Sequence, residues 1–216
     1  MEELTLAQKI AVWVLPILFA ITLHEVAHGW LAWLLGDDTA KRLGRLSLNP
    51  LRHVDPVGTV AVPLVMMLLG GFIFGWAKPV PVDFERLRNP KRDMALVALA
   101  GPGANLLMAL IWALLARFGV WLEWPYVSVP LIYMGAAGIF FNLILMILNL
   151  LPVPPLDGGR VLVGVLPNRW AAMVSQLEPY GMPILLLLLV SGMLGRILGP
   201  VIYAMQGLFF SLAGLS

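Results

Sequence analysis

Residues 24–28, which read His-Glu-Val-Ala-His, decide the fold and the chemistry of this chain. They lie inside an apolar run from about residue 8 to residue 35. A helix needs roughly 20 apolar residues to cross a bilayer, so this run is long enough to span one. Ionisable groups at membrane depth cost roughly 2.5–3.5 kcal/mol each and mark function by default. The stretch therefore predicts a membrane helix that carries a functional site.

The composition agrees with a membrane protein. Of the 216 residues, 60% are hydrophobic and only 12% are charged, whereas about a quarter of a typical soluble domain is charged. The formal net charge is only +2, so the sequence provides no basic surface for nucleic acid. There is no cysteine, which excludes disulfides and thiolate metal ligands. Any metal site must therefore be built from other side chains.

Further apolar runs predict the architecture. They lie at about residues 57–74, 94–118, 129–151 and 184–190, with a last run from about residue 197 to the end. We therefore expect an all-α polytopic membrane protein with about five to six transmembrane helices. No internal repeat or low-complexity linker divides the chain.

Basic residues predict how the helices are oriented, because cytoplasmic loops carry an excess of lysine and arginine. Residues 36–56 contain four basic residues and residues 76–93 contain five, whereas residues 119–128 contain none and carry aromatic side chains suited to a membrane interface. Both basic loops are expected on the cytoplasmic side. A single crossing by residues 57–74 would separate them, so we expect a re-entrant or hairpin path there. Residues 75–82 alternate and carry two prolines, which predicts an extended segment.

The motif in the first helix has the spacing of a metal site. His24 and His28 share one helix face, because positions i and i+4 lie one above the other, so both imidazoles can reach one metal ion. Glu25 is one residue on, where its carboxylate can contact water at the metal. The alternative is that both histidines are buried, hydrogen-bonded helix residues. Three ionisable groups within five membrane residues disfavour that alternative.

A catalytic zinc ion normally has three protein ligands, so a third must come from elsewhere in the chain. His53 is the only other histidine, but it follows Arg52 in a basic loop and is expected to be solvated or to face lipid headgroups. Asp157 follows a long, nearly uncharged stretch. The prolines before it interrupt a continuous helix, and the two glycines after it permit close backbone approach. Such a break suits an aspartate that turns into a helix bundle.

Two further motifs accompany the first. Residues 100–105 read Ala-Gly-Pro-Gly-Ala-Asn, and Asn149-x-x-Pro152 leads into Leu-Asp-Gly-Gly at residues 156–159. With the His-Glu-x-x-His motif, in this order, they make the chain from about residue 21 to residue 160 resemble the site-2 protease family of intramembrane zinc metalloproteases. The chain has no room for a PDZ or CBS domain, so the resemblance is to a minimal form of the family.

The resemblance implies one zinc ion per chain, ligated by His24, His28 and Asp157, with Glu25 as the catalytic acid and base. It also implies a core of three helices, with the site a short way in from the cytoplasmic face. Family members cut transmembrane segments of membrane-tethered regulators, usually after a first cleavage. We therefore expect one membrane-embedded metalloprotease domain over residues 1–216, whose catalytic core covers about 8–165 and whose C-terminal helices cover about 170–216.

Substrate contacts are less determined by the sequence. Asn105 and Asn149 are candidates to donate hydrogen bonds to the substrate or to the tetrahedral intermediate. Hydrogen bonding between helices of the bundle is an equally good interpretation of both residues. The extended segment at residues 75–82 could bind an unwound substrate as an added strand, although its prolines restrict the available edge.

Two other functions remain open at this point. A metal transporter could place histidine and aspartate in membrane helices, although more ligands along a path would be expected. A catalytically inactive relative could bind membrane segments without cleaving them. Paired haem ligands are disfavoured, because the two histidines lie on one turn of one helix. The expected partners are a transmembrane substrate and the lipid bilayer, without nucleic acid, and the features of the chain fit a prokaryotic inner membrane; the oligomeric state stays open.

Overall fold

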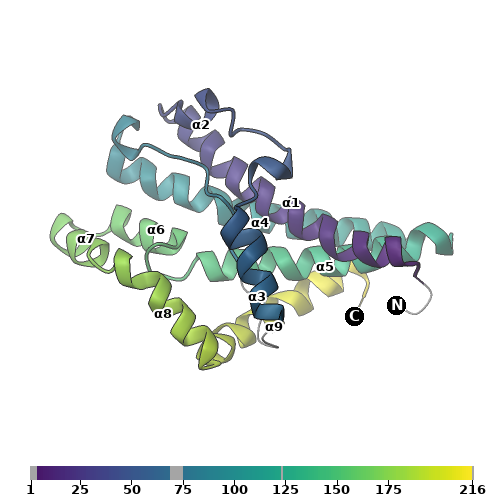
Figure 1. The fold of residues 1–216 in the computed structure, drawn as a ribbon. Coiled ribbons are helices and arrows are strands. Elements are labelled where there is room, and N and C mark those ends of the chain that lie inside the picture. The colour runs from purple at the N-terminus through teal and green to yellow at the C-terminus, as the bar shows by residue number, and fades with distance from the viewer. Residues whose placement is uncertain (1–3, 69–74, 123, 216) are drawn as a thin grey trace.

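The computed structural model describes residues 4–68, 75–122 and 124–215, and the regular elements among these residues are all helical (Figure 1). The α-helices are α1 (Leu6–Leu34), α2 (Thr39–Arg42), α3 (Val62–Leu68), α4 (Pro90–Trp121), α5 (Pro125–Asn149), α6 (Asp157–Val165), α7 (Asn168–Ser175), α8 (Glu178–Val190) and α9 (Met193–Ala213). Shorter elements are the 3₁₀ turns η1 (Pro50–Arg52) and η3 (Phe84–Arg86) and the π-helix η2 (Pro56–Ala61). The expected all-α fold is confirmed.

Four helices of the described chain are long and apolar enough to cross a membrane, namely α1, α4, α5 and α9. Helices α7 and α8 bend by 58° at a short break and add a fifth span if they form one broken helix. The described residues thus contain four to five candidate spans, in agreement with the polytopic architecture of about five to six helices that the sequence predicted. The run at residues 57–74 forms the short elements η2 and α3 in its described part.

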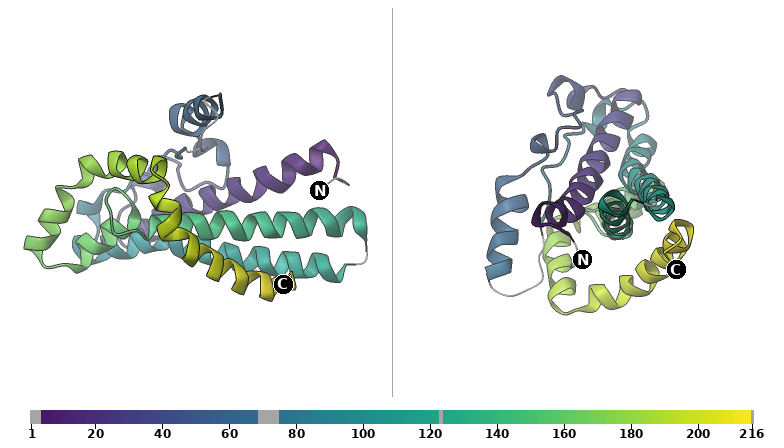
Figure 2. Two further views of the ribbon diagram at one scale, coloured as in Figure 1. Left: turned by 90° about the horizontal axis from the view of Figure 1, so that it is seen from below. Right: turned by 90° about the vertical axis from the view of Figure 1, so that its right-hand side faces the viewer.

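Helices α1, α4 and α5 pack against one another and form the centre of the molecule (Figure 2). Glycines let α4 and α5 approach closely: a Cβ on Gly135 would lie 2.4 Å from the Cβ of Ala116, and one on Gly138 would lie 2.2 Å from the Trp112 ring. Small residues at helix contacts are typical of membrane bundles, which lack a hydrophobic driving force between helices. The three-helix core that the resemblance implied is therefore present.

The C-terminal helices extend this core. Helix α9 packs against α4 and α5, and Leu198 and Phe209 bury their side chains in the same apolar cluster as Trp112. Helix α8 begins beside the turn that precedes α6, where a Cβ on Gly181 would lie 1.6 Å from the Pro154 carbonyl oxygen. The backbone of α8 therefore abuts the turn that leads into α6.

The two basic loops lie at the same end of the bundle. Arg45 Nη2 donates to the Lys78 carbonyl oxygen at 2.9 Å, and the Arg88 N–H donates to the Leu35 carbonyl oxygen at 3.0 Å. These bonds join residues 76–93 to the first basic loop and to Leu35, which immediately precedes it. The two loops thus lie together, as the expected placement on one side of the membrane requires.

The described residues on either side of the apolar run between these loops lie close together. The Trp76 N–H donates to the Gly58 carbonyl oxygen at 3.0 Å, so the two ends of the run are adjacent, as a hairpin or re-entrant path requires. Helix α3 stands apart from α1, α4 and α5 in both views of Figure 2. Residues 75–83 follow without regular secondary structure, as expected for an extended segment. Residues 69–74, which belong to the predicted run, lie outside the described residues.

His53 departs from its expected place. Its exposed fraction is only 2%, so the prediction of a solvated or headgroup-facing histidine is wrong. Its Nε2 lies 2.9 Å from the Ser47 carbonyl oxygen, and its own carbonyl oxygen accepts from the Lys78 N–H at 2.9 Å. The Ser47 carbonyl satisfies Nε2, whereas Nδ1 is buried without a hydrogen-bond partner among the described residues. The backbone of His53 thus forms a hydrogen bond between the two basic loops.

Asp37 makes a second connection between the loops. It is fully buried, and its carboxylate accepts hydrogen bonds from the N–H and hydroxyl of Thr39 and, at 2.8 Å, from the N–H of Asp83. Burial by itself raises the pKa of the Asp37 carboxyl, but these hydrogen bonds outweigh it and hold the pKa below its ordinary value. The ionised form of Asp37 therefore stabilises the contact between the two loops.

Replacing Asp37 with asparagine should lower the stability of the detergent-solubilised chain by about 1–3 kcal/mol, because an amide NH₂ would face a buried donor. Since the folded state lowers the pKa of Asp37, its contribution is present above the unfolded value of about 3.9 and is lost as the pH falls through the folded value. Unfolding curves recorded from neutral to acid pH should thus converge for wild type and Asp37→Asn.

The neighbouring Asp38 offers a matched control, because it is half exposed and pairs with Arg42 at 2.7 Å. Asp38→Asn should change stability by less than about 1 kcal/mol, as exposed ion pairs contribute little. Equal losses in the two variants, or a gap that persists in strong acid, would contradict the role given to Asp37.

Candidate metal centre

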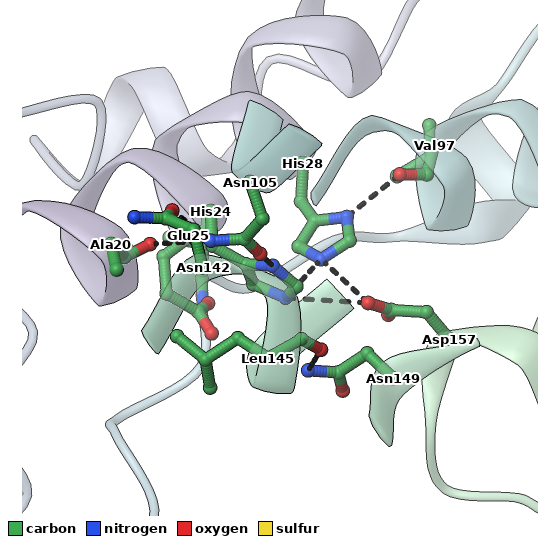
Figure 3. Close-up of polar contacts among 11 residues, drawn as sticks. Ala20, His24, Glu25, His28, Val97, Asn105, Asn142, Leu145, Asn149 and Asp157 are labelled. Carbon is green, nitrogen blue, oxygen red and sulfur yellow. Dashed lines mark hydrogen bonds and ion pairs between the residues drawn. The ribbon is translucent and has the colours of Figure 1, made fainter. Parts of the chain in front are cut away.

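Three buried side chains meet where α1 approaches the start of α6 (Figure 3). His24 and His28 project from one face of α1, and Asp157 is the first residue of α6. The Nε2 atoms of the two histidines are 3.1 Å apart, and Asp157 Oδ2 lies 3.3 Å from the first and 3.2 Å from the second. The structure thus brings together the three residues that the resemblance implied as zinc ligands.

The second nitrogen of each ring determines where its proton lies. His28 Nδ1 is 2.7 Å from the Val97 carbonyl oxygen, which can only accept, so Nδ1 carries the proton. His24 Nδ1 is 2.6 Å from Asn105 Oδ1. The Nδ2 of Asn105 donates to the Ala20 carbonyl oxygen at 3.2 Å, so the amide oxygen faces His24, and His24 Nδ1 is the donor as well. An imidazole that is protonated on Nδ1 alone carries a lone pair on Nε2, where a metal ion can bind.

Three electron-pair donors consequently converge in the buried centre with no proton between them. Asp157 Oδ2 is buried and has no hydrogen-bond partner in the described chain. A bound cation would satisfy all three atoms at once.

The spacing and the chemistry of the donors fit zinc. Zinc binds imidazole nitrogen and carboxylate oxygen at about 2.0–2.2 Å in a tetrahedron, which places ligand atoms about 3.3 Å apart. The observed separations of 3.1–3.3 Å are close to that value. Hydrogen bonds on the remote nitrogen of each ring are also typical of metal-binding histidines.

Glu25 lies next to this centre and is held by the extended segment. Its Oε2 accepts a hydrogen bond of 2.7 Å from the Val80 N–H. The Val80 side chain is buried against α1. It lies so close to Gly29 that a Cβ added to Gly29 would be 2.7 Å from Val80 Cγ1. The segment at residues 75–83 therefore fixes the position of the Glu25 carboxylate.

The same segment has few backbone donors left for an added strand. The N–H groups of Trp76, Lys78 and Val80 donate to Gly58, His53 and Glu25. Pro79 and Pro81, which alternate with these residues, have no N–H at all. A substrate strand would find mainly carbonyl groups on this segment.

Comparison with known proteins supports the same assignment. The model of the peptidase family M50 matches residues 125–191, which include Asp157. "Putative zinc metalloprotease YwhC" of Bacillus subtilis (strain 168) is 37% identical over 195 residues, covering 88% of this chain and 85% of the relative. The chain belongs to peptidase family M50, the site-2 protease family.

Two further relatives also have names that include "zinc metalloprotease". "Putative zinc metalloprotease Rip2" of Mycolicibacterium smegmatis is 30% identical over 204 residues, covering 92% of this chain and 73% of the relative. The protein of the same name in Mycobacterium tuberculosis (strain H37Rv) is 32% identical over 200 residues, with the same two coverages. No solved structure matches this chain.

The two candidate asparagines of this M50 chain differ in their surroundings. Asn105 is fully buried, and its amide nitrogen donates to the Ala20 carbonyl and, at 2.9 Å, to Asn142 Oδ1. Both of its amide hydrogens are thus used in helix–helix contacts. Asn149 is half-buried, and its donation to the Leu145 carbonyl at 2.9 Å uses only one of its two hydrogens.

Sequence reasoning missed three contacts of the M50 centre. The Val97 carbonyl, the Asn142 amide and the close approach of Gly101 all support the histidines. Asn142 could have been noticed as an amide within an apolar span. Gly101 lies in a motif that was recognised, but its contact with α1 depends on how two distant helices pack.

Gly101 provides a direct test of the centre. A Cβ at this position would lie 2.3 Å from His28 Nε2 and 2.6 Å from His24 Cε1. Gly101→Ala should therefore displace the imidazoles and weaken zinc binding by more than about tenfold. Zinc affinity of the purified chain, measured against a coloured chelator, checks this.

Gly103→Ala is the matched control, because Gly103 lies in the same helix and nothing is within 4 Å of its added Cβ. It should bind zinc like wild type and gain up to about 1 kcal/mol of helix stability. If the two variants bind zinc equally well, the imidazoles do not occupy the position described for them.

Proposed function

We propose that this chain is an intramembrane zinc metalloendopeptidase that cleaves transmembrane segments of membrane-tethered proteins, as in regulated intramembrane proteolysis. The observation that carries the proposal is the convergence of His24 Nε2 and His28 Nε2, from an apolar helix long enough to span a membrane, with Asp157 Oδ2 of α6. Glu25 lies beside them on the same apolar helix. The relatives' printed names, which include "zinc metalloprotease", support it. We assign one zinc ion to each chain, held by these three side chains.

The protein groups have distinct parts in the proposed hydrolysis. Bound zinc supplies Lewis acidity, which polarises the scissile carbonyl and lowers the pKa of water towards neutrality. Glu25 takes a proton from the attacking water and delivers it to the nitrogen of the leaving amine as the C–N bond breaks. The Val80 N–H engages Oε2 of Glu25, so Oε1 is the oxygen that carries the proton.

Asn149 is the better placed of the two candidate substrate contacts. It lies near Asp157 in Figure 3, and its second amide hydrogen is not needed for the bond to Leu145. In the proposal this N–H binds a substrate carbonyl. Asn149→Ala should lower kcat/KM by about tenfold or more while zinc content stays unchanged. Loss of zinc in this variant would assign Asn149 to the metal centre instead.

The proposed setting of the enzyme follows from its fold. The metal centre lies towards the end of the bundle that carries both basic loops, which supports an active site near the cytoplasmic face. Apolar helices and bacterial relatives support a prokaryotic inner membrane. We assign residues 1–216 to one membrane-embedded domain, with the catalytic core at about 8–165 and the C-terminal helices at about 170–216. Its partners are then the bilayer and a transmembrane protein or peptide.

Zinc content is the first measurement. Detergent-purified wild type and Glu25→Gln should each contain about one zinc ion per chain, because Glu25 is not a ligand. His24→Ala and Asp157→Ala should lose it. Wild type that is folded, purified without chelator and free of zinc would refute the enzyme assignment and favour a relative that only binds membrane segments.

Cleavage is the second measurement. Wild type and Glu25→Gln are each expressed in the same host. New termini of the host's membrane proteins are then mapped by mass spectrometry. Termini within transmembrane segments should appear with wild type and be absent with Glu25→Gln, whose amide cannot accept a proton. The same termini in both samples would contradict the role of Glu25. Zinc uptake by vesicles that contain Glu25→Gln, without any cleavage by wild type, would support a transporter.

A further inference from the structure

Asn142 has no part in the hydrolysis described above, yet it is one of the largest fully buried side chains in the described chain. It lies in α5, two turns before Asn149, and faces Asn105 of α4. A buried amide in a membrane span is expensive unless every hydrogen bond is made. Its contacts therefore indicate what it does.

We call the side chains of Asn142 and Asn105 the amide pair. In this pair each amide nitrogen donates away from His24, and each amide oxygen accepts from the His24 side. Asn142 Nδ2 donates to the Gly138 carbonyl oxygen at 2.8 Å, so its Oδ1 faces the other way and accepts from Asn105 Nδ2 at 2.9 Å. Asn105 Nδ2 also donates to the Ala20 carbonyl oxygen, and Asn105 Oδ1 is left facing His24 Nδ1. Figure 3 shows this succession from α5 to the His24 ring.

Two backbone carbonyls determine this direction. Carbonyl oxygens only accept, so Gly138 selects the orientation of the Asn142 amide, and Ala20 and Asn142 together select that of the Asn105 amide. Rotating either amide by 180° would place oxygen against oxygen. The amide pair thus presents an acceptor to His24 Nδ1, which keeps the proton there and leaves the Nε2 lone pair for a metal.

We propose that Asn142 is a positioning residue of the metal centre: through Asn105 it holds His24 in the tautomer whose Nε2 binds zinc. The inference rests on the proposed role of His24 as a ligand. Without Asn142, one Asn105 hydrogen would lack an acceptor in a fully buried site, which proteins avoid. The Asn105 amide is then held only by its 3.2 Å bond to the Ala20 carbonyl, and the acceptor that it presents to His24 is less firmly fixed.

The rival explanation is that Asn142 only joins α4 to α5, as polar residues commonly do in membrane bundles. If Asn142 only joins the helices, any substitution that weakens the contact between α4 and α5 should weaken zinc binding equally. Leu143, the next residue of α5, is also fully buried in the helix contact but does not belong to the amide pair. Leu143→Ala is therefore a control for a weakened helix contact.

The test uses full-length protein in detergent, with zinc alone as the probe in chelator competition and cobalt absorption as a report of ligand geometry. Asn142→Leu and Asn142→Ala differ in packing but remove the same hydrogen bonds. Both should weaken zinc binding about tenfold, and Asn105→Leu should weaken it by about 10–100-fold. Leu143→Ala should lower thermal stability and leave the zinc Kd within about twofold of wild type.

A double variant tests whether Asn142 acts through Asn105. Residues that act in series are not additive, so Asn105→Leu/Asn142→Leu should bind zinc no more weakly than Asn105→Leu alone. Nitrogen NMR of labelled histidine in the metal-free chain gives a second readout. It should place the His24 proton on Nδ1 in wild type and divide it between both nitrogens in the Asn142 variants.

Each result decides the matter. Zinc binding by Asn142→Leu and Asn142→Ala within about twofold of wild type, additive losses in the double variant, or an equal loss in Leu143→Ala would overturn the inference and leave the proposed function standing. Wild type that binds no zinc would refute the proposed function and this inference with it.

Discussion

The fold is organised around an arrangement of three atoms that is unfavourable on its own. His24 Nε2, His28 Nε2 and Asp157 Oδ2 point at one another in a buried centre, two as lone pairs and one as a carboxylate oxygen. In a bilayer such groups cannot be relieved by bulk water. A cation converts the mutual repulsion into attraction, so ion binding and the approach of α6 to α1 support each other. The hydrogen bonds at Nδ1 of both imidazoles orient the two rings so that their Nε2 atoms face Asp157.

Those hydrogen bonds explain why α4 lies where it does. Its Val97 carbonyl meets His28 Nδ1, and its Asn105 amide meets His24 Nδ1 from the same side of the bundle. Gly101 lies between these two positions and leaves room for both rings. One helix thus provides both proton acceptors and the space between them, whereas the three candidate ligands come from α1 and α6. The centre is rigid because two helices constrain each imidazole.

The sequence predicted the parts of this arrangement that are local. The spacing of His24 and His28 and the helix break before Asp157 could be recognised without any structure, since each depends on neighbouring residues. The burial of His53 could not, because it results from a loop folding onto residues distant in sequence. The role of Asn142 was missed for a related reason. Its oxygen accepts from Asn105 on another helix, and its nitrogen donates to the Gly138 backbone carbonyl, so neither contact shows in the composition or the period of the sequence. The polytopic all-α architecture could be predicted because it depends on the length of the apolar runs.

The hydrogen bond between Trp76 and Gly58 has a consequence for how such chains can diverge. It closes a loop whose two ends lie side by side at the basic end of the bundle. Everything that the metal centre uses from this region, including the Val80 N–H on Glu25, lies after the closure. Residues between the closing pair can therefore be lengthened or shortened while His24, Glu25, His28 and Asp157 keep the positions that the structure gives them.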